Sequence, residues 1–394
     1  MRVLHIGKYF PPYAGGMETY LRDLVTAQAR QGLEPAALVH QSESSMHSQE
    51  EEYASGDHAI PVTRAAVWAR LLFTPISPTF PWQLQRLIKN QRPDILHFHM
   101  PNVSAFWALF LPSTRRIPWV IHWHSDVLAS EHSVGLRIFY TLYRPFERAL
   151  LKRSKAIIAT SPPYLESSKP LKDFRQKCQV VPLGLDPANL SCDEPPVKES
   201  RPDVLRVLAI GRLTYYKGFE SLIRAAAQVE NVELHIVGGG DLEHSLQELT
   251  AELKAKDKVF FHGKLPDEQL AWQYQACDCL CLPSIERTEA FGMVLLEAMS
   301  HGKATIVSKV EGSGMTWIVD HGVTGEHIPP EDATALAISL RNLQGSRGKM
   351  QALGKRGRDK FYHLFQIDVS AAGVSNVYRK VKGSTDSGIS RVHT

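Results

Sequence analysis

The strongest constraint on the fold is an alternation of short apolar runs with longer amphipathic segments, which occurs twice along the chain. In the first half, the runs predict strands at 2–6, 36–39, 95–98, 119–122 and 156–159, with a helix from 17 towards Gly32. In the second half, they predict strands at 204–210, 232–237, 259–261, 279–282 and 305–308, separated by helices near 219–228, 242–254, from about 267, and 292–300. Such alternation requires crossover connections and parallel sheets. The predicted fold class is α/β, with two doubly wound, Rossmann-like domains.

A polar, proline-rich segment separates the two alternating halves. We predict an N-terminal domain at 1–191, a linker at 192–202, a C-terminal domain at 203–382 whose last helix is free to pack back on the N-terminal domain, and a loose tail at 383–394. The 394 residues are enough for two or three domains. Ligands of open parallel sheets bind beyond the carboxyl ends of the strands, so a tandem pair predicts a ligand cleft between two such edges.

Composition narrows the class of protein. The chain is 43% hydrophobic and 22% charged, as in ordinary globular proteins, and no apolar run approaches the length of a membrane span. The N-terminus lacks the long apolar segment of a signal peptide, and the five cysteines favour a reducing compartment. Cys277, Cys279 and Cys281 alternate on a predicted strand, where they fit as small apolar side chains. We expect a cytoplasmic protein, with a peripheral position on the inner membrane face left open.

The segment 289–297, EAFGMVLLE, follows a predicted strand and starts a helix. The free N–H groups of such a start bind anions well, which suits a diphosphate. Glu289 lies before the helix, where it can accept hydrogen bonds from sugar hydroxyls, and Glu297 lies deeper, where it can hold a ribose diol. The alternative is that Glu289 only caps the helix dipole and Glu297 is solvated. The residues predicted to bind through this helix start are Phe291, Gly292, Met293 and Val294.

The segment 211–218, GRLTYYKG, follows the first strand of the second half. Arg212 and Lys217 place two cations at a strand-to-helix turn between Gly211 and Gly218. An ordinary surface role would suffice for either cation alone. Two cations beside a helix start form a site for a larger negative charge.

A glycine turn at 238–240 follows another predicted strand. A dinucleotide-binding G-x-G-x-x-G would need glycine at 243, where the chain has Glu243, so NAD binding is disfavoured. The glycines still permit a flat nucleobase to approach the backbone. We place Gly240 and Leu265 among the donor-binding residues.

These motifs together resemble those of the retaining GT-B glycosyltransferases of family 4, or group 1. The resemblance rests on the E-x7-E motif with its Phe-Gly and on G-R-L-x-x-x-K-G, and it extends over roughly residues 1–380. The stretches 97–102, 122–126 and 283–289 are similar to those of bacterial mannosyl- and rhamnosyltransferases that build O-antigen or exopolysaccharide chains. The resemblance implies a GT-B fold and transfer of a mannose-like hexose from a nucleoside-diphosphate sugar to a lipid-linked or oligosaccharide acceptor.

The resemblance also implies residue roles. Gly15 and Gly16 would lie against the donor diphosphate and the acceptor, and His124 would contact the donor sugar. Arg212 and Lys217 would stabilise the leaving diphosphate, a role that agrees with the charge such a group develops. Glu289 and the amides after it would hold the sugar and phosphate, with Glu297 on the ribose. The likeness favours a GDP-sugar, leaves a UDP-sugar open, and implies a polyprenyl-linked glycan acceptor.

No metal or cofactor is expected. The sequence contains no D-x-D, so a cation chelated on the diphosphate is not indicated. His97 and His99 form an H-x-H without an evident third ligand, and we place His99 near the acceptor instead. The N-terminal half offers no evident carboxylate nucleophile, and the family likeness implies retention through attack on one sugar face, with the leaving phosphate taking the acceptor proton.

Other activities remain alternatives. A phosphorylase or a sugar-nucleotide epimerase can share this architecture, but neither a pyridoxal-phosphate lysine context nor the carboxylates of an epimerase are visible. A non-catalytic glycan- or nucleotide-sugar-binding relative is the third alternative. Loss of Arg212, Lys217 or Glu289 would indicate it, and all three are present.

Charge is distributed unevenly. Residues 1–60 carry a net charge of −4, whereas residues 61–160 carry +9 together with several aromatic side chains. Basic residues among aromatics suit an anionic membrane surface, and the alternative is a set of solvated helix faces around core aromatics. No nucleic-acid-binding motif accompanies the stretch, so we discount that partner.

Overall fold

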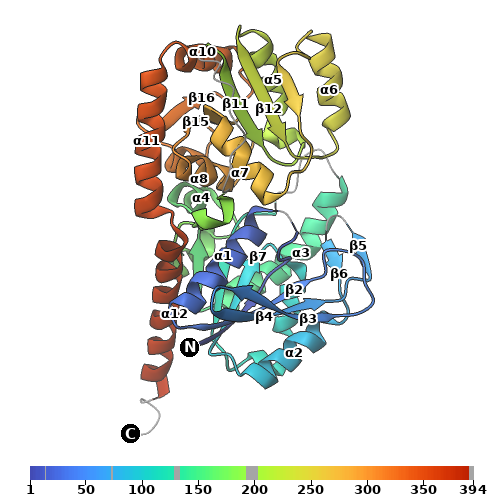
Figure 1. The fold of residues 1–394 in the computed structure, drawn as a ribbon. Helices are drawn as coiled ribbons and strands as arrows, with labels where there is room; N and C mark the ends of the chain where they lie inside the picture. The colour runs from blue at the N-terminus through green and yellow to red at the C-terminus, as the bar shows by residue number, and fades with distance from the viewer. Residues whose placement is uncertain (14, 72–73, 128–133, 192–202, 390–394) are drawn as a thin grey trace. The chain divides into compact units, whose positions relative to one another are not determined.

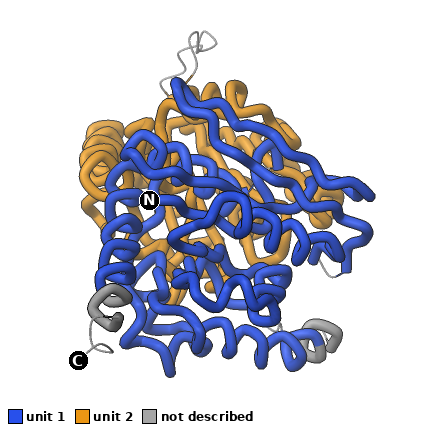
Figure 2. Tube along the Cα trace, turned by 90° about the horizontal axis from the view of Figure 1, so that it is seen from below, with its two compact units in different colours: residues 1–184, 367–394 blue, residues 185–366 orange. Residues whose placement is uncertain are grey.

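The computed structural model describes residues 1–394 apart from 14, 72–73, 128–133, 192–202 and 390–394. The chain forms two compact units, which Figure 2 distinguishes by colour. Unit 1 consists of residues 1–184 and 367–394, and unit 2 consists of residues 185–366. The predicted linker at 192–202 lies outside the described residues.

Unit 1 is built on an eight-stranded sheet in the order β10-β9-β8-β7-β1-β2-β4-β3. Neighbours are parallel except for the antiparallel hairpin β3–β4 at one edge. The strands are β1 (Arg2–Ile6), β2 (Glu34–His40), β3 (Gln49–Ser55), β4 (His58–Ala65), β7 (Ile95–Met100), β8 (Trp119–Trp123), β9 (Ala156–Ala159) and β10 (Cys178–Val180). A separate hairpin pairs β5 (Ala69–Leu71) with β6 (Thr74–Ile76).

Helices connect these strands (Figure 1). They are α1 (Gly16–Arg30), α2 (Phe80–Gln91), α3 (Val134–Arg153), α4 (Pro162–Ser167) and α12 (Ile367–Ile389), with 3-10 turns η1 (Val103–Leu109), η2 (Pro112–Thr114) and η3 (Lys172–Lys177). The C-terminal helix α12 packs beside α1. Tyr20 of α1 and Tyr378 of α12 are both fully buried, so the last helix contributes to the core of unit 1.

Unit 2 is built on a six-stranded, fully parallel sheet in the order β13-β12-β11-β14-β15-β16. The strands are β11 (Leu205–Ile210), β12 (Val232–Val237), β13 (Val259–Phe261), β14 (Cys279–Leu282), β15 (Ala304–Ser308) and β16 (Gly325–Ile328). The helices are α5 (Phe219–Ala227), α6 (Glu243–Glu252), α7 (Asp267–Ala276), α8 (Met293–Ser300), α9 (Met315–Ile318), α10 (Ala333–Gln344) and α11 (Arg347–Leu364), with turns η4 (Pro187–Leu190) and η5 (Tyr215–Lys217).

The predicted fold class is confirmed for each unit, and the predicted strands match the observed ones to within one or two residues. The buried thiols of Cys279 and Cys281 lie in the apolar core of unit 2, as the alternating pattern predicted. Sequence patterns did not identify β4, β5, β6, β10, β16 or the edge strand β3. This edge strand carries three consecutive glutamates and leaves much of its surface exposed, so it lacks an apolar stripe.

The unit boundaries differ from the predicted domain boundaries. Residues 185–191 belong to unit 2, where the Leu190 carbonyl accepts a hydrogen bond from His301 and the Leu185 amide donates to Phe365. Helix α12 belongs to unit 1, in agreement with the predicted packing of the last helix on the N-terminal domain, but it continues to Ile389, through residues predicted as a loose tail. A helix anchored by a packed first half extends at low cost, because each added residue gains a backbone hydrogen bond.

Candidate active site

The strand order of unit 2 reverses between β11 and β14. From β11 the chain proceeds through β12 to β13 on one side, and from β14 through β15 to β16 on the other. Loops that leave the carboxyl ends of two such strands diverge and leave room for a ligand. The loop 211–218 follows β11 and the loop 283–292 follows β14. The two strongest sequence motifs therefore lie at this switch point.

An ion pair joins the two loops. Lys217 Nζ lies 2.5 Å from Glu289 Oε2, and the side chains are only 11% and 13% exposed. Burial by itself lowers the pKa of Lys217, but the adjacent Glu289 carboxylate outweighs it and the net pKa is raised. Lys217 is therefore cationic and held in place. Glu289 is fixed further by Ser284 Oγ at 3.4 Å and, through its carbonyl, by Ser313 Oγ at 2.5 Å.

Arg212 lies in the same loop but differs from Lys217 in exposure. Its side chain is exposed and forms no ion pair with any residue in the described part of the chain. The stem of Lys217 passes over Gly211, where a Cβ would come within 3.0 Å of Lys217 Cε. The loop therefore presents one held cation and one available cation.

The glycines of this region allow backbones to approach closely. A Cβ on Gly218, whose φ is +68°, would lie 2.1 Å from the Pro283 carbonyl oxygen, and a Cβ on Gly240 would lie 2.5 Å from that of Leu213. The Gly238 amide donates to the Gly263 carbonyl at 2.7 Å, which brings the loop before Leu265 alongside. The loops after β11, β12 and β13 thus form one surface. Contact of Gly240 and Leu265 with a nucleobase stays a prediction.

Helix α8 begins at the end of the loop 283–292, which follows β14. Gly292 is its N-cap with a φ of 91°, a conformation that favours glycine. The amides of Met293 and Val294 lie in the first turn and have no acceptor within the helix. The side chains of Phe291 and Met293 are buried, and the Phe291 ring packs edge-on against Phe365. Only the backbone of these residues is therefore suited to hold an anion.

Glu297, one turn into α8, is oriented by a residue that the sequence did not indicate. Tyr274 of α7 donates its hydroxyl to Glu297 Oε2 at 2.5 Å. Tyr274 is fully buried, and this burial, together with the carboxylate, raises its pKa well above the usual value, so the hydroxyl keeps its proton. The ring of His301 stacks on Tyr274 at 5.2 Å between centroids. Glu297 is thus a held acceptor rather than a freely solvated side chain.

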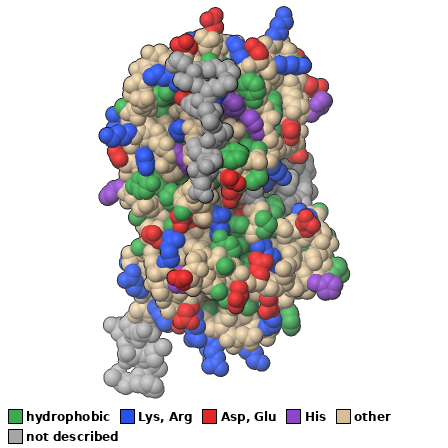
Figure 3. All heavy atoms as spheres, in the orientation of Figure 1, with side chains coloured by type: hydrophobic (Ala, Val, Ile, Leu, Met, Phe, Trp, Pro, Cys, Tyr) green, Lys and Arg blue, Asp and Glu red, His purple; other side chains and the backbone are tan. Residues whose placement is uncertain are grey.

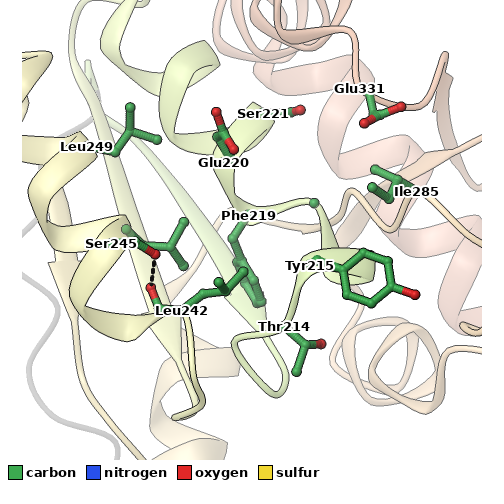
Figure 4. A pocket seen from close by; sticks show the side chains of 12 residues that line it. Thr214, Tyr215, Phe219, Glu220, Ser221, Leu242, Ser245, Leu249, Ile285 and Glu331 are labelled. Carbon is green, nitrogen blue, oxygen red and sulfur yellow. Dashed lines mark hydrogen bonds between the residues drawn. The ribbon is translucent and has the colours of Figure 1, made fainter. Parts of the chain in front are cut away.

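A cavity of about 480 Å³ lies beside the loop 211–218 (Figure 4). Its lining comes from the start of α5, from α6, and from Thr214, Tyr215 and Ile285. None of the residues predicted to bind the donor lines it, and exposed Glu220 and Glu331 lie at its rim. An acidic rim does not suit a diphosphate, so we do not assign the cavity to the donor phosphates.

Unit 1 has a switch point of its own between β1 and β7. Asn102, just after β7, donates its side-chain amide to the Gly7 carbonyl, just after β1, at 2.9 Å. The loop after β1 leads to Gly15 and Gly16, which are exposed at the start of α1. Their contact with a diphosphate stays a prediction. Their position suits it, because they lie at a helix N-terminus at a switch point.

Five buried histidines lie next to this switch point and form what we call the histidine cluster: His5, His97, His99, His122 and His124. They share one face of the sheet, because β1, β7 and β8 are neighbours in which His5 is paired with His97 and His99 with His122. The rings of His122 and His124 stack at 4.4 Å between centroids. Helices α1 and α12 provide further contacts through Gln28, Tyr20 and Tyr378.

The histidine cluster is neutral at physiological pH. Burial lowers the pKa of His5 to about 4 and that of His124 to about 3, and it lowers the pKa values of the other three well below the usual range. His99 uses both ring nitrogens inside the cluster, on His5 at 3.1 Å and on His124 at 2.9 Å. The predicted contact of His99 with an acceptor is therefore not available through its ring nitrogens.

Comparison with known proteins agrees with this geometry. Residues 193–360 match the family described as glycosyl transferases group 1, and residues 14–189 match glycosyltransferase family 4. An uncharacterised glycosyltransferase of Methanocaldococcus jannaschii is 31% identical over 305 residues, 73% of this chain and 75% of the relative. The chain belongs to the group 1 and family 4 glycosyltransferases.

Other known proteins are similar to this glycosyltransferase over nearly its whole length. The O-antigen chain mannosyltransferase C of Escherichia coli is 29% identical over 383 residues, 96% of this chain and 98% of the relative. The solved structure of sucrose-phosphate synthase from Thermosynechococcus elongatus superimposes with a TM-score of 0.80 at 23% identity, over 97% of this chain and 99% of that one. The fold is therefore GT-B, as the motifs implied.

The structure of this glycosyltransferase brings together some predicted site residues within each unit. In unit 2 it joins Lys217 to Glu289, and in unit 1 it joins His99 to His124. Sequence reasoning missed Tyr274, Gln28 and Tyr378, because each reaches its partner through tertiary packing. The i, i+2 spacing of the histidines on two predicted strands was the one available signal for the histidine cluster.

The buried histidines predict that stability falls in acid. Each folded pKa lies below the unfolded value near 6.5, so unfolding takes up protons as the pH decreases, and stability that is complete above about pH 7 is lost between about pH 6.5 and 4. A shift such as that of His5 corresponds to about 3 kcal/mol once fully lost. Hydrogen exchange of β7 and β8, corrected for intrinsic rates, should show less protection at pH 5 than at pH 7.5.

Two substitutions separate this effect from general acid sensitivity. His122→Leu removes a buried imidazole and should make the loss of protection less steep by about one proton. His244→Leu, at a position whose side chain is 85% exposed in unit 2, should leave the slope unchanged. Equal protection at pH 7.5 and pH 5 in the wild type would contradict a neutral cluster.

Proposed function

We propose that this glycosyltransferase transfers a mannose-like hexose from a nucleoside-diphosphate sugar, with retention of configuration, to a lipid-linked or oligosaccharide acceptor in cell-surface polysaccharide synthesis. The observation that carries the proposal is the arrangement at the switch point of unit 2, where Lys217 pairs with Glu289 and Arg212 is exposed in the same loop. The E. coli relative, named an O-antigen chain mannosyltransferase, supports a mannose-like sugar and this pathway class.

The donor diphosphate binds between the two cations and the start of α8. Arg212 supplies the available charge, and a guanidinium can contact two phosphate oxygens at once. Lys217 supplies a second charge that is already positioned, and the N–H groups of Met293 and Val294 supply donors without a net charge. All of these groups stabilise the charge that develops on a departing nucleoside diphosphate.

The nucleoside lies beyond the diphosphate. Glu297 accepts hydrogen bonds from the ribose diol while Tyr274 holds one of its oxygens. The base lies near Gly240 and Leu265. We favour guanine on the family likeness, with uracil as the alternative that the experiment below distinguishes.

Transfer proceeds on one face of the sugar. The bond between the anomeric carbon and the phosphate oxygen breaks, the acceptor oxygen bonds to the same carbon from the same face, and the leaving phosphate takes the acceptor proton. The side chains next to the switch point of unit 1 that form the histidine cluster are neutral imidazoles, and none of them is a carboxylate that could attack the sugar. His124 therefore contributes hydrogen bonding to the sugar rather than a covalent nucleophile.

An anionic membrane surface is the proposed location of the acceptor. The basic stretch is partly neutralised within unit 1, where Arg64 pairs with Glu51 at 2.7 Å and Arg86 pairs with Glu50. On the face shown in Figure 3, cationic and anionic side chains are mixed. The aromatics also divide: Phe80, Phe106 and Trp119 are buried, whereas Trp68, Trp82 and Trp107 are exposed, and Phe73 lies outside the described residues.

The remaining candidate is a surface that we call the η1–α3 face. It is formed by Trp107 of η1, by Phe110 directly after η1, and by Leu142 and Phe146 of α3. These side chains are all exposed, and the rings of Phe110 and Phe146 lie 6.2 Å apart. Arg153, at the end of α3, donates to the carbonyl of Arg115, which ties the exposed cations Arg115 and Arg116 to this helix end. Exposed aromatics beside cations suit an anionic lipid surface. No helix among the described residues has the length and apolar character to cross a bilayer.

The first test of the proposed function combines donor screening with removal of a cation. Thermal shift of the wild type with GDP-, UDP- and ADP-sugars should identify one base, since a ligand at 100 times its Kd adds about 2.7 kcal/mol. In Arg212→Ala, that shift should be largely lost and transfer should slow about 100-fold, because the leaving group loses a charge-assisted contact.

The matched control is Arg224→Ala, which removes an exposed cation of α5 that pairs with Glu220. It should keep both the donor shift and the transfer rate. Lys217→Ala should also stop transfer, with a lower melting temperature before donor is added, because Glu289 loses its partner. Wild-type turnover in folded Arg212→Ala and Lys217→Ala would remove these cations from the site.

Metal independence is a separate prediction. If Arg212, Lys217 and the α8 amides balance the diphosphate charge, saturating EDTA should change the transfer rate by less than about twofold. Strong inhibition that Mg²⁺ or Mn²⁺ reverses would show that a divalent cation performs this role instead.

The η1–α3 face predicts salt-sensitive binding to anionic vesicles. The wild type should co-sediment with phosphatidylglycerol vesicles at low salt and dissociate at high salt, since each engaged Lys or Arg contributes about 1 kcal/mol. Reversal of Arg115, Arg116 and Lys152 to Glu should abolish this binding and spare the donor thermal shift. Trp107→Ala with Phe110→Ala should weaken binding at every salt concentration, because it removes apolar rather than electrostatic contact.

The control is a reversal of equal charge on unit 2, at exposed Lys254, Lys256 and Lys355. It should leave vesicle binding largely unchanged. If the control variant loses binding as completely as the unit 1 variant, attraction depends on net charge and the η1–α3 face is not a docking site. If the wild type ignores anionic vesicles at low salt, the membrane proposal fails.

A further inference from the structure

A continuous chain of hydrogen bonds runs through the histidine cluster. Gln28 Oε1 lies 2.8 Å from His5 Nε2, His5 Nδ1 lies 3.1 Å from His99 Nε2, and His99 Nδ1 lies 2.9 Å from His124 Nε2. All four side chains are buried. This series of hydrogen bonds connects α1 to the end of β8. Its last member is His124, the histidine that we propose contacts the sugar.

The direction of this chain is set at its Gln28 end. Gln28 donates its amide nitrogen to the Tyr378 hydroxyl at 3.2 Å, so its oxygen is the atom that faces His5. The Tyr378 hydroxyl also lies within hydrogen-bond distance of His97 Nδ1, at 2.5 Å. An amide oxygen only accepts, so His5 carries its proton on Nε2.

The remaining tautomers follow one by one. A neutral imidazole has one donor and one acceptor nitrogen, so His5 Nδ1 accepts a hydrogen bond from the N–H at His99 Nε2. His99 Nδ1 is then an acceptor, and His124 donates to it from Nε2. His124 Nδ1 is left without a proton, and it is buried with no hydrogen-bond partner among the residues the structure describes.

We propose that Gln28, His5 and His99 are positioning residues that fix His124 in the Nε2–H tautomer, so that its Nδ1 accepts a hydrogen bond from a hydroxyl of the bound sugar. The second half of this statement rests on the proposed function, and the first half does not. A buried acceptor without a partner is costly in free energy. Among the described residues no donor reaches His124 Nδ1, so a hydroxyl of the substrate would supply the missing hydrogen bond. The tautomer is set before the substrate arrives, so no proton has to move on binding.

The ring nitrogens of the histidine cluster also lie close to one another. Within each of two sets, His5–His97–His99 and His99–His122–His124, the ring nitrogens lie within 4.8 Å of one another. The second set is stacked. Their ring planes are nearly parallel, at interplanar angles of 6° to 16°. The 2.9 Å contact between His99 and His124 is a hydrogen bond with a proton between its nitrogens. Hydrogen bonds link the histidine cluster from Gln28 to His124.

The test is the ¹⁵N spectrum of the full chain labelled in histidine, at pH 7.5, with the His124 signal assigned by its loss in His124→Gln. Long-range ¹H–¹⁵N correlation should show a protonated Nε2 and an unprotonated Nδ1 for His124. Gln28→Leu removes the acceptor that sets the direction and should give a mixture of His124 tautomers. Gln28→Glu retains an acceptor oxygen and should retain the single Nε2–H form.

The matched control is Gln83→Leu, a buried glutamine of α2 in the same unit that has no hydrogen bond to the histidine cluster. It should leave the His124 signals unchanged. This result would distinguish the loss of the hydrogen-bond chain from a general loss of packing. If wild-type His124 carries its proton on Nδ1, or if Gln28→Leu leaves the tautomer unchanged, the proposal is overturned. The wild-type spectrum decides the first point even if a variant fails to fold.

Sugar contact is tested on the same sample. GDP-mannose, or the donor sugar that the thermal shift selects, should move the His124 Nδ1 resonance, whereas the corresponding nucleoside diphosphate alone should not. A donor that binds by thermal shift without moving this resonance would overturn the sugar contact. If no donor binds, the proposed function fails, and the tautomer of His124 still decides whether the chain of positioning residues exists.

Discussion

Each unit is arranged around the place where its parallel sheet reverses strand order. Parallel strands need crossovers that return the chain to the same edge, so every loop that follows a strand lies at the carboxyl edge. At the reversal the crossovers run in opposite directions, and the loops after β11 and β14, or after β1 and β7, separate instead of packing together. The arginine–lysine loop, the α8 start, the Gly15–Gly16 turn and the histidine cluster all depend on this constraint.

The Lys217–Glu289 pair determines how unit 2 meets an anion. Both groups are largely buried, so removal of either leaves a charge that water cannot fully solvate. The pair holds Lys217 in place, but it also neutralises part of its charge. In the proposed donor site, a diphosphate would share Lys217 with Glu289, whereas the exposed Arg212 would give its full charge to the ligand. Arg212 and Lys217 lie five residues apart in sequence, but only Lys217 has a carboxylate partner.

Local signals predicted the strands and loops well, because they depend on short-range pattern. The runs at 232–237 and 156–159 match β12 and β9, and the motifs lie after strands as expected. Partners that meet through packing left no such signal. Tyr378 reaches His97 across 281 positions of sequence, and Tyr274 reaches Glu297 from a different helix. The alternation of His97 with His99 predicts a shared face, but only the strand order places His5 and His122 beside them.

The candidate sites of the two units offer different kinds of groups to a ligand. This difference suits the two parts of a sugar nucleotide. Unit 2 offers cations, helix N–H groups and fixed carboxylates, which match a diphosphate and a ribose. The cluster of unit 1 is neutral, because burial makes an imidazolium costly, and it offers a lone pair with a defined direction. A hydroxyl is a weak ligand for a charge but a good donor to a fixed lone pair. In the proposed function, the neutral acceptor serves the sugar and the charges serve the phosphates, so the two parts of the donor call for different groups.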